Sequence, residues 1–171
     1  MQNIKEVFLK AIKTEQDGIE FYAKAEKQTR HPLGKKMFSS FIADEKTHLR
    51  ILKNLTEEML SAEDRGYLKE KGPKAKLRTA FQESTSRAEK VTETNPDDIQ
   101  ALQIAMNMES EGYKYYTNAA KQATDPDIKA LLSRLAKDEN DHFEILQNTL
   151  FLLEKSGNWF LWEEKGLLDG G

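Results

Sequence analysis

Cysteine is absent from this 171-residue chain, which excludes several classes of site at once. Without a thiol the protein forms no disulfide, no thiolate zinc site and no iron–sulfur cluster, and it has no cysteine nucleophile. A chain of this length buries an adequate hydrophobic core without such crosslinks. We therefore expect any bound metal to serve chemistry rather than folding, and the absence of cysteine fits a reducing cytoplasm.

An excess of charge of one sign and long apolar runs are also lacking. The chain has 26 basic and 29 acidic residues, a net charge of −3, and no basic patch. This balance argues against nucleic acid or an anionic membrane as a partner. No stretch approaches the roughly 20 apolar residues of a membrane helix, and the first residues contain no apolar signal core. We expect a cytoplasmic protein with no nucleic-acid or membrane partner.

Proline and glycine are scarce, at 4 and 9 residues, and they leave four segments with helical periodicity uninterrupted. Short polar breaks at 30–32 and 124–126 divide these segments into two helical hairpins, at about 3–60 and 97–156. Short connections of this kind join antiparallel neighbours. The sequence therefore predicts an all-α protein built from two antiparallel helical hairpins.

The segment between the hairpins, 61–96, is far longer than a turn between helices requires. It contains a modest helical stretch from about Lys74 to Val91. A connection of this length can cross the full length of a four-helix bundle. We expect a bundle domain over 1–157 with 61–96 as its crossover, followed by an aromatic C-terminal tail at 158–171.

The apolar face of each predicted helix contains polar residues where hydrocarbon is expected. Glu15, for example, lies in line with Phe8 and Tyr22. On the second and fourth segments, a Glu-x-x-His pair projects toward one side of its helix, so that one ion can contact both members. The six polar residues at these core positions are Glu15, Glu45, His48, Glu109, Glu139 and His142.

The two hairpins are copies of one another. Residues 15–54 match residues 109–148 without a gap at 15 of 40 positions, where average composition gives about two or three matches by chance. Each core-facing polar residue has its equivalent in the other copy. In each hairpin the first-helix glutamate and the Glu-x-x-His glutamate are equidistant from the turn, so antiparallel packing places them at one level.

Four carboxylates and two imidazoles are thus predicted to meet inside the bundle. Several like charges removed from water are strongly unfavourable unless cations neutralise them. Two divalent cations would balance four carboxylates. Oxygen-rich ligation with two imidazoles and no sulfur suits iron, which we take as the expected metal; manganese fits the same donors, and zinc would bind without redox chemistry.

Further residues near the predicted cluster follow from the same repeat. Tyr22 and Tyr116 lie two helical turns beyond Glu15 and Glu109, where a phenol can hydrogen-bond a ligand carboxylate or supply a proton or electron. We take these tyrosines as the candidate catalytic residues.

Smaller features complete the prediction. Asp44 and Asp138 lie one turn before the histidines, and each is expected to orient the histidine of the opposite helix. Gly18 and Gly112 weaken their helices by about 1 kcal/mol relative to alanine, which suggests space kept clear near the cluster. His31 lies in a turn and is expected to be solvated.

The paired motifs resemble those of a known family. Glu15-x-x-Gly18-x-x-Phe21-Tyr22 with Ala43-Asp44-Glu45-Lys46-Thr47-His48, and their copies Glu109-x-x-Gly112-x-x-Tyr115-Tyr116 and Lys137-Asp138-Glu139-Asn140-Asp141-His142, resemble the rubrerythrin branch of the ferritin-like diiron-carboxylate superfamily. The resemblance extends over residues 3–155. It implies a ferritin-like four-helix bundle with two repeated hairpins joined by a long crossover.

The resemblance also implies roles for the ligands. Glu45 and Glu139 would bridge two irons, His48 and His142 would cap them, and the glutamates of the first and third helices, Glu15 and Glu109, would be terminal ligands. Proteins of this branch typically reduce hydrogen peroxide at the diiron centre.

Two departures from the rubrerythrin pattern matter. Rubrerythrins usually append a rubredoxin module that delivers electrons through four cysteines, and this chain has none. Electrons would therefore come from a separate protein, such as a rubredoxin-like donor. The extra carboxylate often found three residues after the third-helix ligand is replaced here by Gly112.

Two other functions remain open at this point. The chain is alternatively a ferroxidase or an iron-handling or storage protein that oxidises iron and passes it on, with oxygen in place of peroxide as its substrate. The second alternative is a non-enzymatic helical module that binds a partner. We also expect a homodimer, and the repeat permits the hairpins to pair within one chain or to exchange between two.

Overall fold

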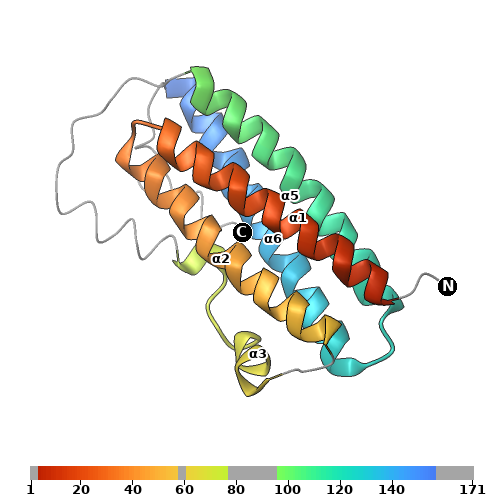
Figure 1. The fold of residues 1–171 in the computed structure, drawn as a ribbon. Coiled ribbons are helices and arrows are strands. Elements are labelled where there is room, and N and C mark those ends of the chain that lie inside the picture. Colours follow the sequence, from red (N-terminus) through yellow and green to blue (C-terminus); the bar gives the residue numbers. More distant parts are fainter. Residues whose placement is uncertain (1–3, 58–60, 77–95, 157–171) are drawn as a thin grey trace.

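The computed structural model describes residues 4–57, 61–76 and 96–156, and over these residues the regular structure is helical, without strands. The prediction of an all-α bundle built from two helical hairpins is confirmed (Figure 1). The helices are α1 (Ile4–Gln28), α2 (Pro32–Thr56), α3 (Ala62–Tyr67), α5 (Pro96–Gln122) and α6 (Pro126–Ser156).

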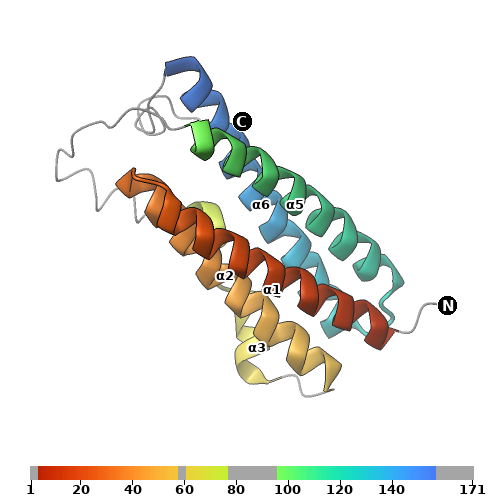
Figure 2. The same ribbon diagram turned by 45° about the horizontal axis from the view of Figure 1, so that its top comes forward.

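The four long helices form the bundle within one chain. Helix α1 packs on α2 and α5 packs on α6, and the two hairpins meet through α1 against α5 and α2 against α6 (Figures 1 and 2). Tyr22 reaches Glu109 while Tyr116 reaches Glu15, so α1 and α5 are antiparallel.

Two apolar clusters fill the bundle, one on each side of a polar level. The first includes Phe38, Phe41 and Leu146, and the second includes Phe8 and Leu131, all at most 2% exposed. Along each long helix, the predicted ligand residues lie between the residues of one cluster and those of the other. The cores therefore hold the polar level rigidly from both sides.

The turn before α2 corrects one prediction. His31 was expected in solvent, but it is only 4% exposed. It is the N-cap of α2, and its Nδ1 accepts a hydrogen bond of 3.2 Å from the backbone N–H of Leu33. The imidazole thereby satisfies a first-turn donor that would otherwise lack a helical partner.

The crossover has to span the bundle, because α2 ends and α5 begins at opposite ends of it (Figure 1). Its first part contains α3, which opens with a capping box between Ser61 and Asp64. Residues 73–76 are helical, and the rest of the helical stretch predicted from Lys74 to Val91 lies outside the described residues. The predicted tail at 158–171 also lies outside them, and the domain limits stay predictions.

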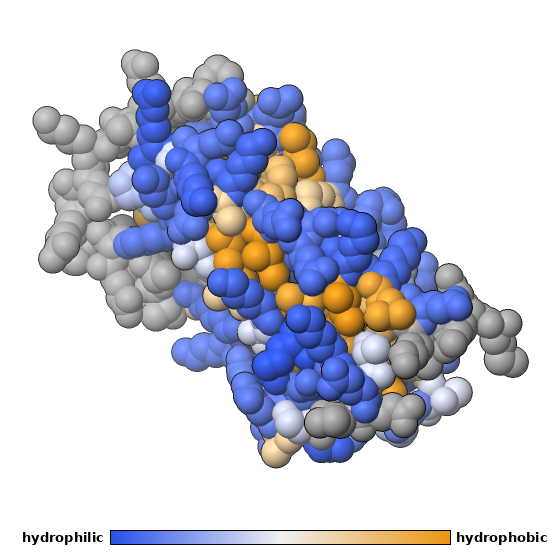
Figure 3. All heavy atoms as spheres, viewed as in Figure 1, coloured by the Kyte–Doolittle hydropathy of each residue, from blue (hydrophilic) through white to orange (hydrophobic). Residues whose placement is uncertain are grey.

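The surface in the view of Figure 1 is mostly polar, with a band of apolar atoms along the face where α1 and α5 lie (Figure 3). A groove between these helices is lined in part by Phe21, Ala25, Ala101 and Ile104. Within the described residues, no helix is long and apolar enough to cross a membrane.

Candidate metal centre

The six residues predicted as metal ligands lie together in the middle of the bundle. Each is at most 5% exposed, and both histidines are completely buried. Helices α1 and α5 contribute one glutamate each, whereas α2 and α6 contribute a Glu-x-x-His pair each. The duplicated hairpin therefore places its two copies of the motif face to face.

The six side chains form two overlapping sets of four donors. One set is Glu15, Glu45, His48 and Glu139, and the other is Glu45, Glu109, Glu139 and His142. Within each set the donor atoms all lie within 4.8 Å of one another. Glu45 and Glu139 belong to both sets, so they occupy the middle of the cluster with one glutamate and one histidine at each end.

Both histidines turn the same ring nitrogen toward this cluster. His48 Nδ1 lies 3.1 Å from Glu45 Oε2 and 3.1 Å from Glu139 Oε1. His142 Nδ1 lies 3.2 Å from Glu45 Oε1. The Nδ1 atoms are thus the ring donors available to a metal, and the Nε2 atoms point away from the cluster.

Each outward-facing nitrogen meets an aspartate of the opposite helix, as the sequence predicted. His142 Nε2 lies 3.3 Å from Asp44 Oδ2, and His48 Nε2 lies 3.6 Å from Asp138 Oδ2. A carboxylate at Nε2 favours the tautomer that carries its proton there, which leaves the Nδ1 lone pair free for a metal.

The two tyrosines also contact the cluster, but across the hairpins. Tyr22 on α1 donates its hydroxyl hydrogen bond to Glu109 on α5, and Tyr116 on α5 donates to Glu15 on α1. The sequence placed each phenol near a carboxylate without saying which one. The antiparallel contact between α1 and α5 decides that each tyrosine holds the end glutamate of the other copy.

Three residues that contact the site were missed by sequence reasoning. Lys76 Nζ lies 2.9 Å from Asp44 Oδ1, and Arg134 Nε lies 2.9 Å from Asp138 Oδ1. The Tyr67 hydroxyl donates to Asp138 Oδ2 and lies 3.0 Å from His48 Nε2.

Two of these residues had a signal in the sequence. The Ser61-x-x-Asp64 spacing is a readable helix start that leads to Tyr67. Arg134 lies one turn before Asp138 on the same helix, where oppositely charged side chains interact. Lys76, in the crossover, had no comparable signal.

The paired glycines leave room for the glutamates in the middle of the cluster. A Cβ at Gly112 would lie 2.7 Å from Glu139 Oε2, closer than real Cβ contacts. A Cβ at Gly18 would meet Glu45 Cγ at 4.0 Å, an ordinary contact. The prediction of cleared space is confirmed at Gly112, whereas at Gly18 a Cβ would fit without displacing its neighbours.

Burial and the neighbouring groups together shift the pKa values of the clustered acids in different directions. Burial, together with the charge of Glu45, raises the pKa of Glu15 to about 8. Burial and the charges of Glu45 and Glu109 raise the pKa of Glu139 well above its ordinary value. Burial alone would raise the pKa of Glu45 too, but the hydrogen bond with Glu15 and the charge of His48 lower it well below. Without a cation, protons on some of these acids limit the repulsion between them.

The histidine pKa values are raised. Burial alone would lower the pKa of His142, but the charge of Glu109 and the hydrogen bond to Asp44 raise it well above its ordinary value. The pKa of His48 moves the same way, because Tyr67, Glu45 and other acidic side chains around it outweigh burial. The cluster therefore favours positive charge at its centre, which a metal cation supplies better than protons do.

Unpartnered buried atoms support the fit to metal. Polar atoms buried in the protein nearly always have a hydrogen-bond partner. In the described part of the chain, four atoms of the cluster that could bind a metal make no aligned hydrogen bond, although His142 Nδ1 lies 3.2 Å from Glu45 Oε1. They are Glu45 Oε1, Glu109 Oε2, Glu139 Oε1 and His142 Nδ1. Each belongs to a residue of the two donor sets, so cations held between them would satisfy all four.

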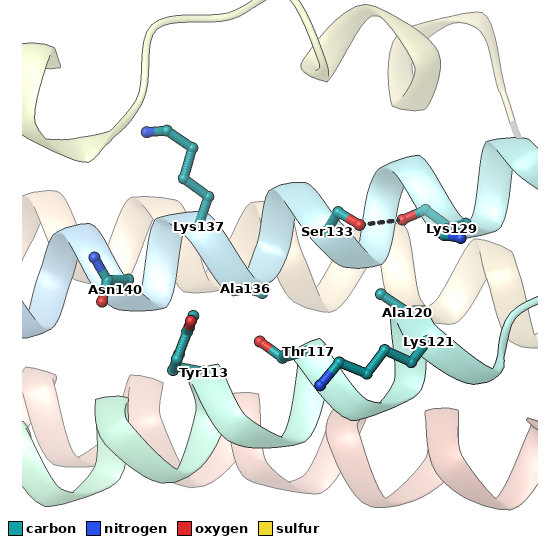
Figure 4. Close-up of a pocket in the computed structure, with 9 residues that line it drawn as sticks. All are labelled: Tyr113, Thr117, Ala120, Lys121, Lys129, Ser133, Ala136, Lys137 and Asn140. Atoms are coloured by element: carbon teal, nitrogen blue, oxygen red, sulfur yellow. Dashed lines mark hydrogen bonds between the residues drawn. The ribbon is translucent and has the colours of Figure 1, made fainter.

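A surface groove elsewhere on the bundle does not belong to this site. It has a volume of about 430 Å³ and lies between α5 and α6, where Tyr113, Thr117 and Asn140 line it with lysines (Figure 4). None of the six clustered residues lines it.

Together, the fold and the cluster define a class: a ferritin-like helical bundle whose buried glutamate–histidine cluster fits a diiron site. Comparison with known proteins then gives the family. The chain matches the Rubrerythrin family over residues 6–150 and belongs to it. No curated protein and no solved structure matches the chain.

Proposed function

We propose that this protein is a diiron oxidoreductase that reduces hydrogen peroxide to water with electrons from a separate donor protein. The observation that carries the proposal is the sharing of Glu45 and Glu139 between two four-donor sets. Two sets that share their middle carboxylates are suited to two adjacent metal ions rather than one. In this assignment Glu15 and Glu109 are the terminal ligands, and His48 and His142 cap the two ends.

Iron is the metal that the donors and the reaction favour. Carboxylates and imidazoles without sulfur bind iron or manganese, whereas zinc offers no redox change. Reduction of one hydrogen peroxide to two waters consumes two electrons and two protons. Two bound iron ions would supply both electrons when each changes from the ferrous to the ferric state.

Two tyrosines position the terminal glutamates and place hydroxyl groups beside the metal site. Tyr22 and Tyr116 are completely enclosed, and their hydroxyls donate to Glu109 and Glu15. Burial and the charge of Glu109 raise the pKa of Tyr22 well above its ordinary value, so its phenol stays protonated at neutral pH. We assign both tyrosines as the catalytic residues: each positions a terminal carboxylate and keeps a protonated phenol beside the site of reaction.

We propose that a separate protein delivers the electrons, since these 171 residues contain no cysteine that could hold a thiolate iron centre. A rubredoxin-like protein has the appropriate chemistry for this donor. The two-electron cycle would close when such a donor returns the iron ions to the ferrous state.

Rapid mixing tests the proposed reaction. The anaerobic ferrous protein is mixed in a stopped-flow instrument with hydrogen peroxide and, separately, with oxygen, and the absorbance of ferric iron is followed. We expect peroxide to oxidise the centre faster. Faster oxidation by oxygen, with sustained turnover on ferrous iron alone, would instead identify a ferroxidase, which uses the same ligands.

Metal analysis of matched variants tests the site itself. We expect two iron ions per chain in the parent and a severe loss in Glu45→Ala and Glu139→Ala. Glu111→Ala is the control, because Glu111 lies on α5 near the cluster but its side chain is 76% exposed. Retention of two metals by both cluster variants would contradict the assignment.

A further inference from the structure

The two hairpins are copies, but the groups around their histidines differ because the crossover contacts only one of them with a tyrosine. Asp44 and Asp138 are equivalent in the repeat, and each lies at Nε2 of the opposite histidine. Their other partners differ, because Asp44 pairs with Lys76 whereas Asp138 pairs with Arg134 and accepts from Tyr67. The first hairpin has Ser40 where the second has Arg134.

Tyr67 is tightly enclosed at this position. It is 1% exposed, and its hydroxyl contacts both Asp138 and, at 3.0 Å, His48 Nε2. The Arg134 guanidinium lies 4.6 Å from the centre of the Tyr67 ring and donates a 3.0 Å hydrogen bond to the Tyr67 carbonyl. The phenol therefore has one well-defined position, against the outer nitrogen of a single histidine.

Contacts with α2 hold helix α3 in the position from which the Tyr67 hydroxyl reaches His48. Asp64 is completely buried and accepts a 2.8 Å hydrogen bond from Asn54 on α2, together with one from Arg50. Its other contacts are with Ser61 at the start of α3. A six-residue helix has little stability of its own, so these contacts with α2 fix where Tyr67 lies.

We propose that Tyr67 is a positioning residue for His48 and makes the two metal positions unequal. The position formed with Glu15 and His48 depends on the crossover phenol, and the position formed with Glu109 and His142 does not. The inference rests on the proposed dinuclear site. Hydrogen bonds to the outer nitrogen of a metal-binding histidine fix its ring orientation, and their loss typically costs about 10–100-fold in metal affinity.

Cobalt titration in single-position backgrounds tests the inference. His142→Ala leaves only the position that contains His48, and His48→Ala leaves only the other. Tyr67→Phe is added to each background and to the parent, and anaerobic binding of Co²⁺ is followed by its visible absorption bands. We expect Tyr67→Phe to weaken Co²⁺ binding about 10–100-fold in the His142→Ala background and to leave it unchanged in the His48→Ala background.

Two further variants separate positioning from general loss of structure. Tyr115→Phe removes another tyrosine hydroxyl, which donates to the Val7 carbonyl, and should leave Co²⁺ affinity unchanged in both backgrounds. Asp138→Asn should reproduce the selective effect of Tyr67→Phe without altering α3. Helical circular dichroism confirms that each variant is folded.

The outcomes distinguish the inference from the proposed function. A parent protein that binds no Co²⁺ would overturn the dinuclear site and the inference with it. A parent that binds two Co²⁺ while Tyr67→Phe weakens both positions equally, or neither, would overturn only the role of Tyr67.

Discussion

Gly112 shows how narrowly one residue can constrain the cluster. The ideal Cβ position at Gly112 lies 2.7 Å from Glu139 Oε2 and 3.3 Å from Glu139 Cδ. The Glu139 carboxylate belongs to both donor sets, so moving it disturbs both. A side chain at Gly112 therefore competes for the space of the residue that the proposed centre depends on most.

Alanine substitutions at the equivalent glycines should have opposite consequences. Gly112→Ala should displace Glu139 and weaken metal affinity by at least about tenfold, as is typical when the groups that hold a metal ligand are altered. The metal content of the purified protein should fall accordingly. Gly18→Ala, whose Cβ meets Glu45 Cγ at 4.0 Å, should keep the metal and stabilise the helix by up to about 1 kcal/mol. Metal analysis and thermal denaturation measure both effects. Equal metal retention by the two variants would show that the glycine is not needed for space.

Single residues also show where sequence reasoning succeeded and failed. The core position of Glu15 was readable because a carboxylate interrupts an apolar stripe of period 3.6. The burial of His31 could not be predicted, because it depends on the hydrogen bond that His31 Nδ1 accepts from the backbone N–H of Leu33. A polar residue in a turn is usually solvated, and only the local backbone geometry distinguishes a cap.

At the scale of elements, α3 illustrates a helix defined by tertiary contacts. It spans six residues, too few for an apolar period to appear in the sequence. Its fixed position comes from Asp64, which joins it to Arg50 and Asn54 on α2. The element is therefore held by the buried polar contacts of Asp64 together with Tyr67, which packs in the second apolar cluster.

Removal of the Asp64 carboxylate should release α3. Asp64→Ala leaves Arg50 and Asn54 without this partner and removes one half of the capping box, so we expect the free energy of unfolding to fall by about 1–3 kcal/mol. Guanidinium denaturation measures the change, and hydrogen exchange should be fastest in α3. Glu63→Ala is the control, since the Glu63 side chain is 74% exposed and should contribute little. Unchanged exchange in α3 after Asp64→Ala would contradict this account of its anchoring.

In the molecule as a whole, the bundle encloses more acidic than basic groups at its centre, and a bound metal cation would neutralise the excess negative charge. Two apolar clusters enclose four carboxylates and two imidazoles at the middle of the bundle. In the metal-free protein, bound protons supply part of the positive charge that a cation would provide. This follows from the raised pKa values of Glu15, Glu139 and both histidines. Stability should therefore depend on both pH and metal.

The metal-free protein should lose stability as pH rises from about 4.5 to about 8. Glu15 has a pKa of about 8 in the folded state against 4.5 for a free glutamate, so over this range the folded state holds a proton that the unfolded state has lost. The raised histidine pKa values act in the same direction above pH 6.5. Asp138, with its pKa lowered to about 2, acts oppositely but only below pH 3.8.

Thermal denaturation of chelator-treated protein between pH 5 and 8 measures this dependence. The metal-loaded protein is the control, and its melting temperature should be higher and less sensitive to pH, because metal ligands have already released their protons. A melting temperature of the metal-free protein that rises over this range would contradict the proposed proton occupancy.

The four long helices, the duplicated hairpin and the six clustered residues could all be predicted from the sequence. Apolar periodicity indicates which face of a helix is buried, and the repeat indicates which polar residues on that face lie in the same cluster. Antiparallel geometry within a hairpin then fixes the level of Glu15 against Glu45, since both are equidistant from a short turn. These are relations between residues near in sequence or related by an exact offset.

How the hairpins meet and what the crossover contributes depend on long-range packing. The register of α1 against α5 pairs Tyr22 with Glu109, and no local pattern specifies a register between helices separated by a long connection. The contact of Tyr67 with His48 depends in the same way on how the crossover packs across the bundle. Long-range packing therefore gives His48 and His142 different surroundings, which the repeat alone would make equivalent.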